Sequence, residues 1–280
     1  MRLATVTGPA GTTAAVQDGD DWLALPAPDQ SVAYATGVLE PGAAVPAGFT
    51  SAYPTGTVVP GAVPVLPLPS PRKVVCCGLN YGEHIQETGR DLPTHPTLFA
   101  KFADTLTGPD DDLRLDASAQ WDWEAELAVV VGATLHRADR ATALAGIGGY
   151  TVANDLSARD WQRRTLQWFQ GKAWDATTPV GPVVVTPDEV DPVAGLLVTC
   201  RIGGEEVQRD STKTLVFDAA DLLSYVSTFT TLRPGDLVLT GTPGGVGMAR
   251  DPQRWLADGD VLETEVEGIG TLRNTVRLVP

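Results

Sequence analysis

Three acidic residues alternate with apolar residues in one short stretch of the chain, WDWEAEL. Asp122, Glu124 and Glu126 are separated by Trp123 and Ala125. Side chains alternate between the two faces of a β-strand, so the acids are expected on one face and the apolar residues on the other. Acids placed in this way repel one another unless water or a cation neutralises them, and hard cations such as Mg²⁺ prefer oxygen ligands. The stretch predicts either a solvated strand face or part of a metal site.

A further carboxylate lies where another apolar run ends. Asp155 follows the run 150–154, in the sequence YTVANDLSARD. The end of a strand could deliver it as a third metal ligand. The alternative is a turn or cap, because Ser157 and Asp160 have capping-box spacing for a short helix.

A histidine and a glutamate three residues apart are the candidate acid–base pair. His84 and Glu87 would be neighbours on a helical turn, where the carboxylate could orient the imidazole as a general base. A lone histidine is more often structural, so both interpretations stay open. His95 and His136 are interpreted as structural or exposed.

Two further segments offer groups that could bind an anion. Lys172 is flanked by aromatic residues in QWFQGKAWD, where it could be partly desolvated and directed at an anion, or could extend past apolar neighbours to solvent. The glycine-rich segment 241–247, GTPGGVG, lacks the ending of a phosphate-binding P-loop. Its amides could hold a carboxylate, and a flexible turn is the alternative.

Composition limits the classes of function. The chain has 280 residues, a formal net charge of −15 and three cysteines. The negative charge disfavours nucleic acid as a partner, and no basic stripe opposes it. No apolar run approaches the roughly 20 residues that span a bilayer, and the start of the chain does not resemble a signal peptide. We therefore expect a soluble, cytoplasmic protein that binds neither nucleic acid nor membrane.

Alternation and turn residues predict mainly strands. A small β-rich N-terminal domain is expected over residues 1–66, with a proline-rich linker at 67–71 and a larger domain at 72–280. The clearest helix spans 217–229, with Asp218 as a possible N-cap. The expected strands are 3–6, 13–16, 22–25, 73–77, 123–131, 149–153, 183–186, 197–202, 237–240 and two within 261–279.

The order of these motifs is more specific than any one of them. Along residues 72–280 the chain carries NY…HxxE, ExE, NDxSARD, GK…D…PxGP and PGD…TGTPxGVG. Together they resemble the fumarylacetoacetate hydrolase family, and the N-terminal segment resembles that of its bacterial two-domain members. The resemblance implies a mainly β (α+β) fold, a mixed β-sandwich roll, in a homodimer.

The resemblance also implies roles for individual residues. It assigns Glu124, Glu126 and Asp155 as ligands of Mg²⁺ or Mn²⁺, leaving Asp122 as a neighbour. The family's base corresponds to His84 with Glu87, and its lysine to Lys172. Tyr81, Gly241 and Thr242 are expected to contact the substrate. Phe102 and Trp174 depart from residues that are common in the family, and these two positions could shape the pocket.

The implied substrates are small anionic 2-oxo acids. We expect hydrolysis of a C–C bond in an acylpyruvate or a related 1,3-dicarbonyl acid, with the metal stabilising enolate-like charge and Lys172 stabilising an oxyanion. The alternative on the same metal site is an oxaloacetate-type decarboxylase or a 2-hydroxymuconate-type isomerase. A non-catalytic metal- or ligand-binding protein is a third interpretation, and the presence of His84, Glu87 and Lys172 argues against it.

Overall fold

The computed structural model describes residues 1–39, 53–82 and 92–280. His84 and Glu87, the predicted acid–base pair, lie outside the described residues. The fold and the remaining site residues are described below.

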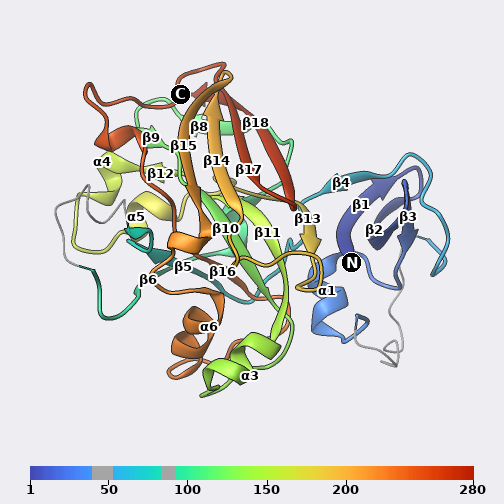
Figure 1. The fold of residues 1–280 in the computed structure, drawn as a ribbon. Helices are drawn as coiled ribbons and strands as arrows, with labels where there is room; N and C mark the ends of the chain where they lie inside the picture. The colour runs from blue at the N-terminus through green and yellow to red at the C-terminus, as the bar shows by residue number, and fades with distance from the viewer. Residues whose placement is uncertain (40–52, 83–91) are drawn as a thin grey trace.

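Two sheets form the body of the protein, as the predicted mainly β fold requires (Figure 1). The larger has eleven strands, and nine of them follow the order β3-β2-β1-β13-β11-β10-β16-β5-β6, with β4 on β1 and β7 on β13. Its strands are β1 (Arg2–Gly8), β2 (Gly11–Asp18), β3 (Asp21–Ala24), β4 (Val63–Val65), β5 (Val74–Gly78), β6 (Thr97–Lys101), β7 (Leu106–Thr107), β10 (Ala125–Val131), β11 (Ile147–Asn154), β13 (Thr178–Val185) and β16 (Leu237–Leu239).

The second sheet has five strands in the order β15-β14-β17-β18-β8. They are β8 (Leu113–Asp116), β14 (Leu197–Ile202), β15 (Glu205–Ser211), β17 (Val261–Val266) and β18 (Gly270–Val279). This sheet packs against β10, β11 and β13 of the larger one. A short ladder of β9 (Trp121–Asp122) and β12 (Ser157–Ala158) stands beside them.

Strand β10 lies in the middle of the larger sheet, and all seven of its residues are buried. The predicted strand 123–131 begins two residues later than expected, at Ala125. Trp121 and Asp122 form β9, while Trp123 and Glu124 connect it to β10. Burial on both faces explains the continuous apolar run 127–131, which alternation alone would not give. Helices α3 (Arg140–Ala145) and α6 (Ala219–Ser227) pack on each other at the lower edge of Figure 1.

The N-terminal strands are continuous with the larger sheet. Leu3 of β1 pairs with Val184 of β13, and β4, which precedes the proline-rich linker, pairs with β1. A hairpin turn follows Asp18, because Asp18 pairs with Asp21. Gly19 in that turn has φ +59°, a left-handed value that glycine adopts without a steric cost. Helix α1 (Gln30–Ala35) packs on β1 and β2.

Asp218 caps its helix as predicted, whereas the alternative of a cap at Ser157 and Asp160 is not what the structure shows. In α6 Asp218 is the N-cap, and Asp221 completes a capping box. Helix α4 (Arg159–Gln162) has no side-chain cap at its N-cap, Ala158. The carboxylate of Asp160 accepts instead from the backbone amide of Gln120, so a tertiary contact replaces the local one. The remaining helices are α5 (Phe169–Lys172) and the short 3-10 turns η1 (Ala103–Thr105), η2 (Thr212–Thr214) and η3 (Gly247–Ala249).

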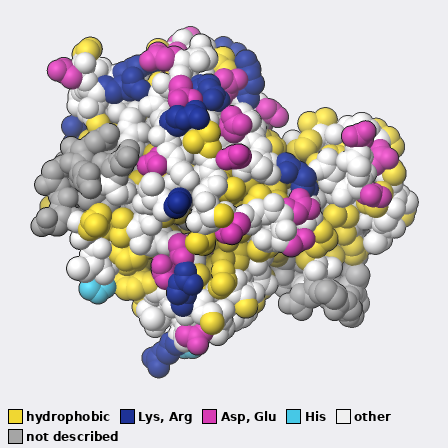
Figure 2. All heavy atoms as spheres, in the orientation of Figure 1, with side chains coloured by type: hydrophobic (Ala, Val, Ile, Leu, Met, Phe, Trp, Pro, Cys, Tyr) yellow, Lys and Arg dark blue, Asp and Glu magenta, His cyan; other side chains and the backbone are white. Residues whose placement is uncertain are grey.

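The surface is mixed in charge. On the described part of the face in Figure 2, Lys and Arg side chains lie among Asp and Glu, with hydrophobic side chains between them. The described residues contain no helix that is both long and apolar enough to cross a membrane. Cys76, Cys77 and Cys200 are free and buried, as small apolar side chains on strands would be.

Candidate active site

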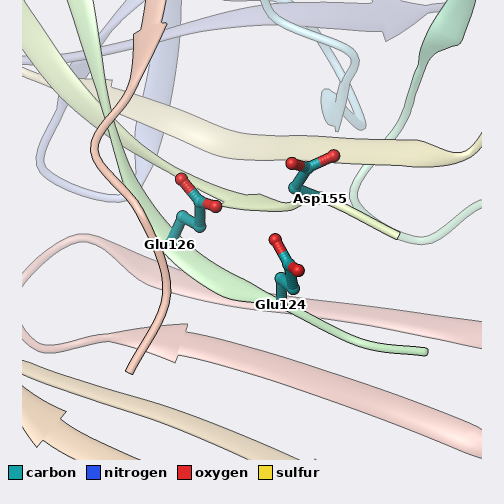
Figure 3. A group of neighbouring side chains, drawn as sticks. All are labelled: Glu124, Glu126 and Asp155. Atoms are coloured by element: carbon teal, nitrogen blue, oxygen red, sulfur yellow. The ribbon is translucent and has the colours of Figure 1, made fainter. Parts of the chain in front are cut away.

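Three buried carboxylates converge beside the middle of the larger sheet (Figure 3). Glu124 precedes β10, Glu126 lies within it, and Asp155 follows the neighbouring strand β11. The amide of Asp155 donates to the carbonyl of Glu124 over 2.9 Å, which ties the two strand ends together. One oxygen from each carboxylate lies within 4.8 Å of the others. The sheet therefore brings together the three residues that the sequence predicts as metal ligands.

Two buried lysines neutralise part of this acidic cluster. The Lys172 ammonium lies 2.6 Å from Oε2 of Glu124 and 2.7 Å from Oδ2 of Asp155. The Lys101 ammonium lies 2.5 Å from Oδ1 of Asp155. Burial alone would raise the pKa of Asp155, but the charges of the two lysines outweigh it and hold that pKa below its ordinary value. Burial would likewise lower the pKa of Lys172, and the charges of Asp155 and Glu124 reverse this effect. Both partners are therefore charged at neutral pH.

Arg159 holds two acids from the other side. Its Nε donates to Oδ2 of Asp122 over 2.8 Å, and its Nη2 lies 2.7 Å from Oε1 of Glu124. A third donation, from Nη1, reaches Gln162 over 2.9 Å. Asp122 also accepts from the amides of Gly247 and Met248. Asp122 thus supports Arg159 and the glycine-rich segment, which agrees with its interpretation as a neighbour of the ligands.

Glu126 is the acid of the cluster with the least compensation. Among the described residues, its carboxylate has one hydrogen bond, from the amide of Gly241 over 2.6 Å. Burial raises the pKa of Glu126 well above its ordinary value, and the charges of Asp155 and Glu124 raise it further. The charge of Lys172 offsets this effect only in part, and in the described part of the chain no salt bridge reaches Glu126.

The cluster has the composition of a site for a hard divalent cation. In the described part of the chain, four buried carboxylates (Asp122, Glu124, Glu126 and Asp155) meet three cations (Lys101, Arg159 and Lys172). Every ligand oxygen comes from a carboxylate, the donor that Mg²⁺ and Mn²⁺ favour. A bound cation would compensate Glu126, so these residues fit the metal that the sequence predicts.

The three predicted substrate contacts have different surroundings. Thr242 lines the pocket beside the cluster, donates from its hydroxyl to the carbonyl of Ala125 and accepts from Gln208. The Gly241 amide donates to the carboxylate of Glu126, so it supports a predicted metal ligand. Tyr81 is fully buried, and its hydroxyl has no hydrogen-bond partner among the described residues. Burial, assisted by the charge of Glu126, raises the pKa of Tyr81, so the hydroxyl stays protonated.

A pocket of about 470 Å³ opens beside the cluster. Its lining includes Glu124, Lys172, Thr242, Arg159 and Gln162, and most of its other residues are apolar. The two positions that depart from the family, Phe102 and Trp174, both lie outside this lining. Trp174 packs edge-on against Trp121 and Trp161, with ring centroids 5.3 and 5.1 Å apart.

Sequence reasoning assigned no role to two charged residues of the site. Arg159 occurs in the NDxSARD motif, four residues after Asp155, and Lys101 ends strand β6. The available signal for Lys101 was that it ends a mostly apolar strand, TLFAK. Its partner Asp155 is 54 residues away in the chain, so the pair could not be found from local spacing.

Known proteins resemble both the sequence and the fold. A family model described as fumarylacetoacetate (FAA) hydrolase C-terminal matches residues 73–277. The oxaloacetate tautomerase Fahd2a of Rattus norvegicus, a mitochondrial protein, is 44% identical over 212 residues, which cover 75% of this chain and 68% of that protein. A 2,4-didehydro-3-deoxy-L-rhamnonate hydrolase of a Sphingomonas species is also 44% identical, over 73% of each chain.

One solved structure with a similar fold contains both a metal ion and a 2-oxo acid. The fumarylpyruvate hydrolase of Pseudomonas aeruginosa, solved with Mn²⁺ and pyruvate, is 32% identical with a TM-score of 0.67, and the match covers 75% of this chain and 91% of that one. The matched family model, the relatives and this solved structure agree with the family that the motifs indicate. This chain belongs to the fumarylacetoacetate hydrolase family.

Proposed function

We propose that this chain is a divalent-metal-dependent hydrolase that cleaves a C–C bond in an acylpyruvate or a related 2-oxo acid. The observation that carries the proposal is the position of Lys172. Its ammonium group is buried, contacts two of the proposed metal ligands, and lines the pocket beside them. A substrate held at the cluster would therefore meet a fixed positive charge as it reacts.

Glu124, Glu126 and Asp155 are proposed to hold Mg²⁺ or Mn²⁺. A bound cation would supply Lewis acidity to the oxygens of the 2-oxo acid. Arg159 and Lys101 orient the ligands, because each holds a carboxylate oxygen of Glu124 or Asp155. The P. aeruginosa hydrolase solved with Mn²⁺ and pyruvate supports this assignment.

The chain's own residues would divide the hydrolysis between them. His84, oriented by Glu87, takes a proton from water as the oxygen of that water adds to the acyl carbonyl carbon. Lys172 stabilises the negative charge on the carbonyl oxygen. The bond from that carbon to the neighbouring methylene carbon then breaks, and the methylene carbon receives a proton. The products are a carboxylic acid and pyruvate. Thr242 at the pocket wall is proposed to contact the substrate carboxylate.

Tautomerisation or decarboxylation of oxaloacetate is the second candidate. The 44% identity to an oxaloacetate tautomerase favours it. Moving a proton between the carbon and oxygen atoms of a 2-oxo acid requires no attacking water. Decarboxylation needs no attacking water either, and the described cluster and Lys172 would suffice for it. Tautomerisation needs a base to take the carbon-bound proton and hydrolysis needs one to activate water, the role that we propose for His84.

A metal-depletion assay tests the proposal. Chelator-treated protein should lose turnover of acylpyruvates, and Mn²⁺ or Mg²⁺ should restore it. Glu126→Gln keeps the size of the side chain but removes a charged ligand, so it should require more metal for half-maximal activity. Unchanged turnover after verified metal removal would contradict the proposed metal dependence.

Three broader features remain proposals. We propose a homodimer in the cytoplasm, which sedimentation and cell fractionation would test; the rat relative is named as mitochondrial. We also propose an N-terminal domain (1–66), a linker (67–71) and a catalytic domain (72–280), a division that the family match over 73–277 supports. The proposed partners are small anionic 2-oxo acids, with no nucleic acid and no membrane.

A further inference from the structure

The pocket beside the acidic cluster is lined by charged and by apolar side chains. Glu124 and Lys172 lie at the proposed metal site. Four apolar side chains also line the pocket: Phe99, Trp168, Val246 and Met248. The 2-oxo acid head of a substrate would lie at the charged groups. The volume beyond it, within a pocket of about 470 Å³, is available to the rest of the substrate.

Phe99 lies between Lys172 and Trp168 in this series of contacts. The Lys172 nitrogen lies 5.0 Å from the centroid of the Phe99 ring. That ring stands edge-on to the indole of Trp168, with centroids 5.5 Å apart and planes at 70°. The aromatic wall therefore begins directly beside the ammonium group that we propose to face the acyl carbonyl. The part of the substrate beyond that carbonyl would meet aromatic rings.

The aromatic wall packs closely against the backbone of Gly78. Gly78 ends strand β5, and a Cβ at this position would lie 2.6 Å from Cζ3 of Trp168. Carbon atoms in ordinary contact are about 3.5–4.0 Å apart, so Trp168 rests where only a glycine leaves room. Trp168 is also the N-cap residue of α5, the helix that ends at Lys172. The same short helix thus positions both the aromatic wall and the lysine.

Arg163 is the charged residue of the lining that could favour a different substrate. Its guanidinium donates to two neutral acceptors, the carbonyl of Arg159 and the amide oxygen of Gln120, and these bonds leave its charge unpaired among the described residues. Arg163 could therefore pair with a second substrate carboxylate, and the comparison with 2-oxoglutarate below tests that alternative. Arg159 itself is occupied by Asp122 and Glu124.

We propose that the acyl group of the substrate is apolar, an alkyl or aryl chain, and that Phe99 and Trp168 select it. This inference rests on the proposed function, because it places the 2-oxo acid head at the acidic cluster. Each methylene that moves from water into the wall should tighten binding about 4-fold. A substrate carboxylate packed against Phe99 and Trp168 should be disfavoured, because an unpaired charge would be taken out of water.

Binding of simple 2-oxo acids to the Mn²⁺-loaded protein tests the inference without requiring hydrolysis. Calorimetry would give Kd for pyruvate, 2-oxobutanoate, 2-oxohexanoate, phenylpyruvate and 2-oxoglutarate. We expect Kd to fall about 4-fold with each added methylene that the wall buries, and phenylpyruvate to bind more tightly than pyruvate. In Trp168→Ala, Kd should change much less from one of these 2-oxo acids to the next.

The next residue supplies a matched control. Phe169 packs edge-on against Phe102 and stands outside the pocket lining. In Phe169→Ala, Kd should therefore fall along the series as it does in the wild type. If Trp168→Ala fails to fold, Gly78→Ala serves instead, because the added Cβ displaces the indole and should weaken phenylpyruvate binding more than pyruvate binding.

The outcomes separate this inference from the proposed function. Equal Kd values across the series, or tightest binding of 2-oxoglutarate, would overturn the apolar selection. A steep series with no hydrolysis of acetyl-, hexanoyl- or benzoylpyruvate would support the selection and refute the hydrolase. Hydrolysis of acetylpyruvate with a flat binding series would support the hydrolase and refute the selection.

Discussion

The ammonium nitrogen of Lys101 lies 2.5 Å from Oδ1 of Asp155, and neither side chain is exposed. Lys172 binds the other oxygen of the same carboxylate over 2.7 Å. Each oxygen keeps a further lone pair, so Asp155 can still offer a ligand atom. The two lysines therefore fix a buried acid in its ionised form and orient it toward Glu124 and Glu126.

We expect Lys101→Met to destabilise the metal-free protein by about 3–5 kcal/mol, because a buried carboxylate loses one of its two cations. Urea unfolding measures this change. Saturating Mn²⁺ should recover part of the stability, since a ligand that binds only the folded state stabilises it. Lys213→Met, at an exposed lysine, is the control and should stay within about 0.5 kcal/mol of the wild type. Equal stability of the two variants would show that Lys101 does not hold Asp155.

Arg159→Lys should weaken metal binding about 10- to 100-fold, although the charge is kept. The guanidinium holds Asp122 and Glu124 with two different nitrogens, a geometry that one ammonium group cannot reproduce. Calorimetric titration with Mn²⁺ measures the affinity. Arg163→Lys, four residues further on and exposed, should bind the metal as the wild type does. Similar losses in both variants would point to a disturbed helix α4.

Lys172→Met should lower the hydrolytic kcat about 10²- to 10³-fold, as removal of one group that stabilises an oxyanion does. The affinity for Mn²⁺ should be retained or increased, because the positive charge of Lys172 opposes a cation at the same carboxylates. Steady-state kinetics at saturating metal and a separate metal titration measure the two effects. A fall in metal affinity that accounts for the whole loss of rate would make Lys172 a support of the ligands only.

His84→Ala should lower kcat for acylpyruvates about 10²- to 10⁴-fold while metal affinity stays unchanged. Decarboxylation of oxaloacetate by the same variant should be less affected, because it uses no attacking water and no base to activate one. His136→Ala, at an exposed histidine that contacts Thr231, is the control. Parallel losses of metal binding and rate in His84→Ala would assign this histidine a structural role.

Local patterns predicted much of the fold. Strand β14 has the predicted bounds, and Asp218 begins α6 as expected. These features depend on neighbours in sequence, through alternation, capping and turn residues. Ser157 and Asp160 also had the local pattern of a cap, but the amide of Gln120 took the carboxylate of Asp160. A tertiary hydrogen bond there outweighed the local preference.

The parts that could not be predicted depend on contacts between distant residues. Arg159 reaches Asp122 across 37 positions, and the Gly241 amide reaches Glu126 across 115. No spacing rule encodes such pairs, which form only when β10, β11 and the glycine-rich segment meet. The pairing of Leu3 with Val184, which extends the larger sheet into the N-terminal strands, is of the same kind.

Hydrolysis in ¹⁸O-labelled water tests the central proposal most directly. Wild-type protein with Mn²⁺ would be given acetyl-, hexanoyl- and benzoylpyruvate, and the products would be analysed by mass spectrometry after brief reaction. The account predicts one labelled oxygen in the carboxylic acid released from the acyl group, with pyruvate as the second product. Intact acylpyruvates, together with efficient tautomerisation or decarboxylation of oxaloacetate by the same preparation, would contradict it.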